Sequence, residues 1–179
     1  MKNIILNIVL FQIGWFACVL TAANDIAVVG ALISILILMT HIKLSVNAKQ
    51  ELRIISIAML LGLFWDSILV SVGLLNYHSG MVVSFLAPYW IVLMWALFAT
   101  TINSSLAWLK EKLFVAAVFG AISGPLAYYA GAKLGAVIFI NEMVALLALS
   151  IGWALFTPLL LIFSSFKEHE GKAEMEEAL

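Results

Sequence analysis

The chain has 179 residues, of which 65% are hydrophobic and only 11% are charged, and its formal net charge is −1. Because so few polar side chains cannot coat a water-soluble globule, the composition indicates an integral membrane protein. The near-neutral charge gives no sign of a nucleic-acid partner, and the single cysteine, Cys18, excludes an intrachain disulfide and a cysteine-based metal cluster.

Hydropathy divides the chain into six segments, each close to the roughly 20 residues that a helix needs to cross a bilayer. We place these spans at about 3–22, 26–43, 53–75, 82–108, 113–131 and 143–166. The predicted fold is therefore all-α, a polytopic bundle of about six transmembrane helices in one domain. Residues 132–142 are apolar enough to be either a re-entrant segment or a loop, so five or seven spans stay open, and residues 167–179 form a short acidic tail.

Lysine and arginine are concentrated at one end of the predicted spans, and cytoplasmic loops are enriched in these residues. With both termini in the cytoplasm, only Lys133 falls on the outer side. The cytoplasmic side then collects Lys2, Lys43, Lys49, Arg53, Lys110, Lys112, Lys167 and Lys172. This distribution predicts an even number of spans, with both termini and the acidic tail in the cytoplasm.

Asp66 is an isolated carboxylate in the third span, next to Trp65. A charge at the bilayer centre costs roughly 2.5 to 3.5 kcal/mol on insertion scales, so Asp66 indicates a functional site. Counting about 1.5 Å per residue from the cytoplasmic helix ends gives the residues at the same depth. They are Trp15, Phe16, Gly30, Trp95, Pro125 and Trp153.

The residues at the depth of Asp66 have two possible interpretations. In the first, the tryptophans and the carboxylate line a small-molecule pocket, with Tyr128 as a further polar group toward the outer face. In the second, the tryptophans fill the core, and Asp66 accepts hydrogen bonds from an indole, from Ser67 or from backbone freed by a proline. Equal depth does not make residues face each other, so the sequence does not decide between them.

Small residues recur at every fourth position of the fifth span, at Ala116, Gly120 and Gly124, and the spacing returns at Gly131 and Gly135. Such spacing lets helix backbones approach closely in lipid. Proline at position 125 removes a backbone donor and is expected to kink the helix. The segment is therefore either a tightly packed kinked helix or a broken helix that lines a site.

The inner half of the fourth span carries a band of polar side chains that cannot all face lipid. Its members are Thr100, Thr101, Asn103, Ser104 and Ser105. Either they form interhelical hydrogen bonds or they line a cytoplasmic cavity.

Catalytic and metal motifs are missing from the sequence. It contains no Walker loop, no HExxH and no GxSxG, and its histidines are too far apart for a helix-spaced metal pair. No metal and no cofactor is therefore predicted, and a role other than catalysis is favoured.

Three stretches of the sequence resemble a small bacterial inner-membrane family catalogued as domain of unknown function 2878. They are FQIGWFAC at 11–18, WDS at 65–67 and GPLAYYAG at 124–131. The resemblance covers nearly the whole chain and implies location in the bacterial inner membrane, but it supplies no activity or catalytic residue. Members are often encoded beside enzymes resembling cyclopropane-fatty-acid synthases, which implies a role in membrane-lipid modification or envelope stress.

We therefore predict an accessory protein that binds a lipid or small amphiphile, with membrane lipids and a lipid-modifying enzyme as partners. The candidate ligand-binding residues are Asp66, Trp65, Trp15, Trp95, Trp153, Pro125 and Tyr128. One alternative is a secondary transporter that uses Asp66 as a proton or cation site. Another is a membrane enzyme in which Asp66 acts as acid or base with a second group such as Tyr128 or Lys133.

Overall fold

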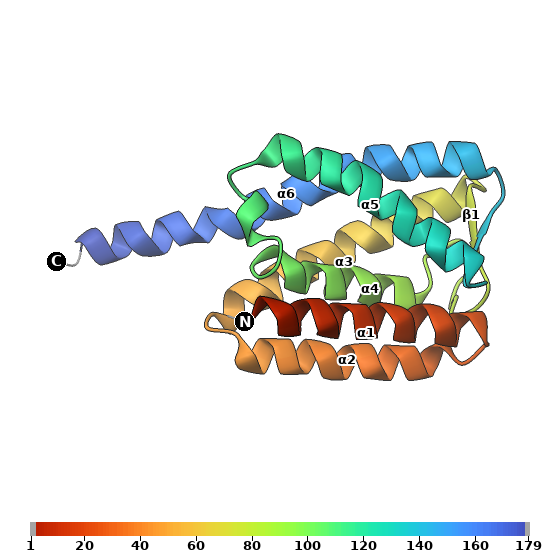
Figure 1. Ribbon diagram of the computed structural model, residues 1–179, viewed down its shortest axis with the longest axis horizontal. Helices are drawn as coiled ribbons and strands as arrows, with labels where there is room; N and C mark the ends of the chain where they lie inside the picture. Colours follow the sequence, from red (N-terminus) through yellow and green to blue (C-terminus); the bar gives the residue numbers. More distant parts are fainter. Residues whose placement is uncertain (1–2, 178–179) are drawn as a thin grey trace.

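The computed structural model describes residues 3–177, with side chains described over residues 3–165. The described residues form six α-helices, one short 3-10 helix and a pair of strands (Figure 1). In chain order they are α1 (Ile4–Ala23), α2 (Ala27–Leu44), α3 (Ala48–Ser71), β1 (Leu75–Tyr77), α4 (Tyr89–Ile102), η1 (Ala107–Leu109), α5 (Leu113–Lys133), β2 (Val137–Phe139) and α6 (Glu142–Glu177).

Five of the described helices are long and apolar enough to cross a membrane: α1, α2, α3, α5 and the Glu142–Ser165 part of α6. Their outward faces carry large exposed apolar side chains, among them Ile5, Leu36, Phe64 and Phe114. Such a surface suits lipid and not water. The chain is thus a polytopic helical membrane protein.

The remaining helix, α4, has 14 residues and is about 21 Å long at 1.5 Å per residue, which is too short to cross a bilayer unaided. It lies inside the bundle, where it packs against α1, α2, α3 and α6 (Figure 1). The predicted span 82–108 is shortened at both ends. Pro88 caps the start because proline lacks an amide hydrogen and suits the first turn, and the helix ends at the polar Asn103.

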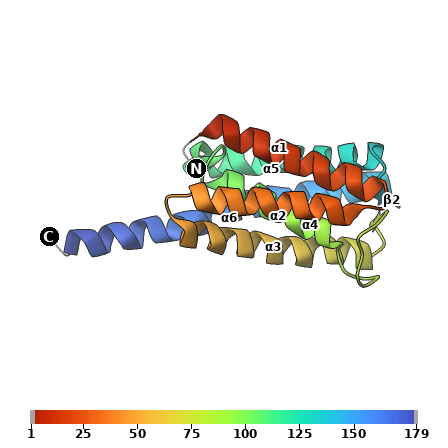
Figure 2. The same ribbon diagram turned by 90° about the horizontal axis from the view of Figure 1, so that it is seen from below.

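Residues 132–142 do not form a re-entrant helix. They contain the last two residues of α5, a turn at Gly135 with φ of +92°, and strand β2. Strands β1 and β2 pair antiparallel, with Tyr77 opposite Val137, and close the end of the bundle near the start of α6 (Figure 2). Because side chains alternate along a strand, Leu75 and Tyr77 are both buried while Asn76 is exposed.

Helix α1 begins and α6 ends at the same end of the bundle (Figure 1). Lys43 lies in the last turn of α2, Lys49 and Arg53 lie in the first two turns of α3, and Lys110 and Lys112 lie between η1 and α5, all at this end, whereas Lys133 ends α5 at the other. That this end faces the cytoplasm remains a prediction. The acidic tail predicted at 167–179 lies outside the described side chains, as do the side chains of Lys2, Lys167 and Lys172, although the backbone of α6 continues to Glu177.

Candidate functional site

Asp66 is fully buried on α3, and three side chains from three other elements donate hydrogen bonds to its carboxylate. The hydroxyls of Tyr77, on β1, and Tyr128, on α5, both donate to Oδ1 at 2.7 Å. The indole N–H of Trp95, on α4, donates to Oδ2 at 2.8 Å. The carboxylate therefore joins four elements, and each of its oxygens has a donor.

Trp95 and Tyr128 are two of the residues that the sequence singled out beside Asp66, whereas Tyr77 is not. Tyr77 lies in a stretch that hydropathy marks as a turn, and nothing local in the sequence signals its inward orientation. Its ring packs edge-on against Trp90, with centroids 5.6 Å apart. Burial raises the pKa of Tyr77 well above its usual value, and the neighbouring carboxylate raises it further, so its hydroxyl keeps the proton that it donates.

The other tryptophans of the predicted level have different neighbours. Trp153 stacks on Trp95, with centroids 4.5 Å apart and planes 15° from parallel. Trp65 instead packs edge-on against Phe156 at 5.3 Å. The indole N–H groups of Trp65 and Trp153 have no partner among the described residues. Of the tryptophans predicted at the depth of Asp66, Trp95 donates a hydrogen bond to its carboxylate, whereas Trp65 and Trp153 do not.

The small residues of α5 lie where α6 crosses it. A Cβ atom at Gly120 would meet the backbone oxygen of Trp153, and one at Gly124 would meet the Trp153 ring. Ala116 is also buried. These positions let α6 come close enough for the Trp153 ring to reach Trp95.

The other glycines and the proline of α5 take no part in this contact. Gly131 lies near Val137 of β2, and Gly135 lies in the turn beyond the end of the helix. Pro125 lies inside α5, which continues on both sides of it. The helix is therefore not interrupted at the proline.

A cavity of about 430 Å³ lies between α1, α4 and α5. Its wall is largely apolar and includes Trp15, Met94, Trp95, Phe98 and Tyr128. Gln12, Phe119 and Leu126 also line it and are exposed on α1 and α5, so the cavity opens sideways toward the lipid-facing surface.

Asp66 lies behind the cavity wall. Trp95 and Tyr128 each line the cavity and each donate to Asp66, whereas Asp66 itself is not part of the described lining. Lys133, considered as a second reactive group, lies over the Tyr129 ring instead, with Nζ 4.9 Å from its centre. The carboxylate therefore holds two wall residues in place.

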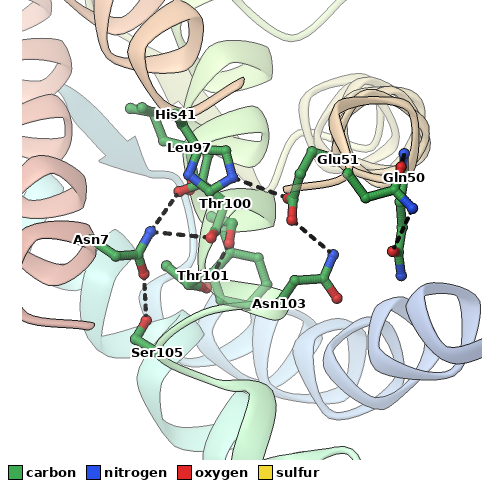
Figure 3. A network of polar contacts seen from close by, with 11 residues as sticks. Asn7, His41, Gln50, Glu51, Leu97, Thr100, Thr101, Asn103 and Ser105 are labelled. Carbon is green, nitrogen blue, oxygen red and sulfur yellow. Dashed lines mark hydrogen bonds and ion pairs between the residues drawn. The ribbon is translucent and has the colours of Figure 1, made fainter. Parts of the chain in front are cut away.

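A network of buried polar side chains joins the end of α2, the start of α3 and the end of α4 (Figure 3). His41 Nε2 and Glu51 Oε2 are 3.0 Å apart, and both residues are buried. Asn103 donates from Nδ2 to the other carboxylate oxygen of Glu51 at 3.3 Å. Nδ1 of His41 has no partner among the described residues.

A second branch of the network joins α1 to the segment that follows α4. Asn7 donates from Nδ2 to the backbone oxygen of Thr100 at 3.1 Å and accepts at Oδ1 from the Ser105 hydroxyl at 2.8 Å. Ser105 and Thr101 also line the cavity. The polar band of the fourth span therefore forms interhelical hydrogen bonds and, at two positions, faces the cavity.

Among the described residues, no group of three or more histidine, cysteine, aspartate or glutamate side chains is arranged to hold a metal ion. The sequence matches the family described as protein of unknown function (DUF2878) over residues 4–159. The chain belongs to this family. Comparison with curated proteins finds no match, and comparison with solved structures finds none. The DUF2878 match includes the three donors to Asp66, the residues that line the cavity and both branches of the polar network.

Proposed function

We propose that this DUF2878 protein binds a lipid or small amphiphile in the cavity between α1, α4 and α5. The observation that carries the proposal is the sideways opening of an apolar cavity at exposed residues of two membrane-spanning helices. Its volume, about 430 Å³, falls within the usual range of ligand pockets. An amphiphile can reach such an opening from the bilayer without crossing water.

The hydrogen bonds to Asp66 support this function because they fix the wall before a ligand arrives. Trp95 is held by its bond to Asp66 on one edge and by stacking on Trp153. A rigid wall reduces the entropy that binding costs. Asp66 is fully buried beneath its three donors, so transport or acid–base chemistry there would require at least one of them to move.

We further propose that the protein acts in the bacterial inner membrane, with its lysine-rich end in the cytoplasm, as an accessory to a lipid-modifying enzyme. The charge distribution supports the orientation. The enzyme partner rests on the resemblance described above and on no contact in the structure.

The test fills the cavity with a side chain. Ala127 lines the cavity on α5, and Ala127→Phe would occupy part of its volume. Ile122, 57% exposed on the same helix, lies outside the described lining of the cavity, so Ile122→Phe is the matched control. Native mass spectrometry with lipid analysis of each purified protein measures what stays bound.

We expect the unaltered protein and Ile122→Phe to retain the same bound lipid or amphiphile, and Ala127→Phe to lose it while staying folded and abundant. Equal retention by all three proteins would refute binding in this cavity.

A further inference from the structure

We infer that the cavity selects an amphiphile with an uncharged, hydroxyl-bearing head, which binds at the Thr101 and Ser105 end. This inference rests on the proposed function and specifies the chemical class of its ligand. It follows from three observations: the described lining has no charged side chain, the Thr101 and Ser105 hydroxyls already donate hydrogen bonds within the protein, and Gln12 lies at the opening.

The first observation is charge. Among the described residues that line the cavity, none is a lysine, arginine, histidine, aspartate or glutamate. The titratable group in the lining is Tyr128, and its hydroxyl is bonded to Asp66. Burying a charged head without a partner is strongly unfavourable. A carboxylate, phosphate or ammonium head therefore has no counter-charge in this cavity.

The second observation is where the hydroxyl protons point. Thr101 donates to the backbone oxygen of Phe98 at 2.6 Å, and Ser105 donates to Oδ1 of Asn7 at 2.8 Å. Since a hydroxyl has one proton and two lone pairs, both side chains can then offer only acceptor oxygens to the cavity. Their complement is a ligand group that donates.

The direction of the Ser105 bond is fixed by the rest of the network (Figure 3). The side chain of Asn7 faces the backbone oxygen of Thr100, which can only accept. The amide nitrogen of Asn7 must therefore face Thr100, which turns its oxygen toward Ser105. This leaves Ser105 as the donor, and its proton is not available to a ligand.

The third observation is Gln12, whose amide is exposed at the opening of the cavity on a helix that is otherwise almost entirely apolar. A polar group that faces hydrocarbon without a partner is costly. A hydroxyl head can both donate to and accept from this amide. Gln12 therefore suits the same class of head as Thr101 and Ser105.

The test compares probes with one chain and different heads. The protein is reconstituted in phosphatidylcholine nanodiscs, because this lipid has no hydroxyl group, and is then offered dodecanol, dodecyl methyl ether, dodecanoate or dodecyltrimethylammonium. Native mass spectrometry counts the molecules retained. We expect dodecanol to be retained about tenfold more than the ether, which corresponds to one hydrogen bond at the upper end of its usual contribution. The two charged probes should be retained even less.

Two serine variants locate the head. Ser105→Ala should lower retention of dodecanol and leave retention of the ether unchanged. Ser150→Ala removes a comparable hydrogen bond, to the backbone oxygen of Ala121, outside the described lining, and should change neither. The comparison of the four probes on the unaltered protein remains decisive if a variant fails to fold.

The outcomes separate the two proposals. If the ether or dodecanoate is retained as well as dodecanol, and all are lost in Ala127→Phe, the cavity binds amphiphiles but the inference about the head is wrong. If no probe is retained, or if Ala127→Phe retains dodecanol as well as the unaltered protein, the proposed function itself fails.

Discussion

The hydroxyl of Tyr77 donates to Oδ1 of Asp66 across 2.7 Å, which ties the short strand β1 to the membrane-spanning helix α3. Since β1 pairs with β2, and Tyr128 of α5 and Trp95 of α4 also donate to this carboxylate, Asp66 holds together two helices that flank the cavity and the paired strands. We expect the stability of the bundle to depend on these donors.

Removing either tyrosine hydroxyl should destabilise the protein. Tyr77→Phe and Tyr128→Phe each delete one buried donor and leave the ring in place. We expect each to lower the free energy of unfolding by about 0.5 to 2 kcal/mol, which is the usual range for such bonds. Thermal unfolding in detergent measures the change. Tyr129→Phe, at the neighbouring position, is the control and should have little effect, and an equal loss there would argue against the bonds to Asp66.

Asp66→Asn should act on both stability and binding, although Asp66 does not line the cavity. The amide keeps the shape of the carboxylate but replaces one acceptor oxygen with a donor, so at least one of the three donors loses its partner. We expect a loss of about 1 to 3 kcal/mol and weaker retention of bound amphiphile, because the wall formed by Trp95 and Tyr128 loosens.

The control for Asp66→Asn is Asp25→Asn. Asp25 is exposed and has a φ of +60°, a conformation that asparagine tolerates well, so this substitution should be close to neutral. If Asp66→Asn unfolds at the same temperature as the unaltered protein and retains the same lipid, the carboxylate does not hold the wall.

The sequence predicted the helical bundle, because hydropathy depends only on local residues. It also named Trp95 and Tyr128 as candidate ligand-binding residues. It did not predict which tryptophan faces the carboxylate, since that depends on rotation of the helices. Gly62 makes room for the Trp95 ring in the folded bundle, and no spacing within α4 reveals this.

Tyr77 was missed for a different reason. A three-residue strand has too few residues for a periodic signal, and its inward face is set by pairing with β2, about sixty residues later in the chain. The length of α4 was overestimated because the segment before it is also apolar, and apolar residues return at Leu106 after the polar Asn103 to Ser105. Hydropathy alone does not distinguish an apolar coil from a helix.

The contact between α5 and α6 should be sensitive to single methyl groups. Gly120→Ala and Gly124→Ala each place a Cβ atom against Trp153, at its backbone oxygen and at its ring respectively. We expect each to cost about 1 to 3 kcal/mol, the usual effect of overpacking. In Gly131→Ala, the added atom lies 3.4 Å from Val137, an ordinary contact, so this variant should be neutral or slightly more stable. A uniform response of all three glycines would show that helix propensity, and not packing, decides the outcome.

The two histidine–carboxylate pairs among the described side chains should respond differently to the same substitution. His41 and Glu51 are buried and 3.0 Å apart, whereas the side chains of His78 and Asp25 are 41% and 73% exposed and 3.3 Å apart. Removing one partner of a buried pair leaves the other polar group without compensation, which costs up to about 3 to 5 kcal/mol. Exposed pairs contribute about 0 to 1 kcal/mol.

We therefore expect His41→Leu to lower the unfolding temperature strongly and His78→Leu to change it little. The double variant His41→Leu/Glu51→Leu should recover part of the loss, because two apolar side chains can replace a buried pair without leaving a carboxylate exposed to the apolar core. Recovery will be incomplete, since Asn103 loses the carboxylate oxygen to which it donates. A double variant less stable than His41→Leu alone would mean that Glu51 is held by its other neighbours and not by His41.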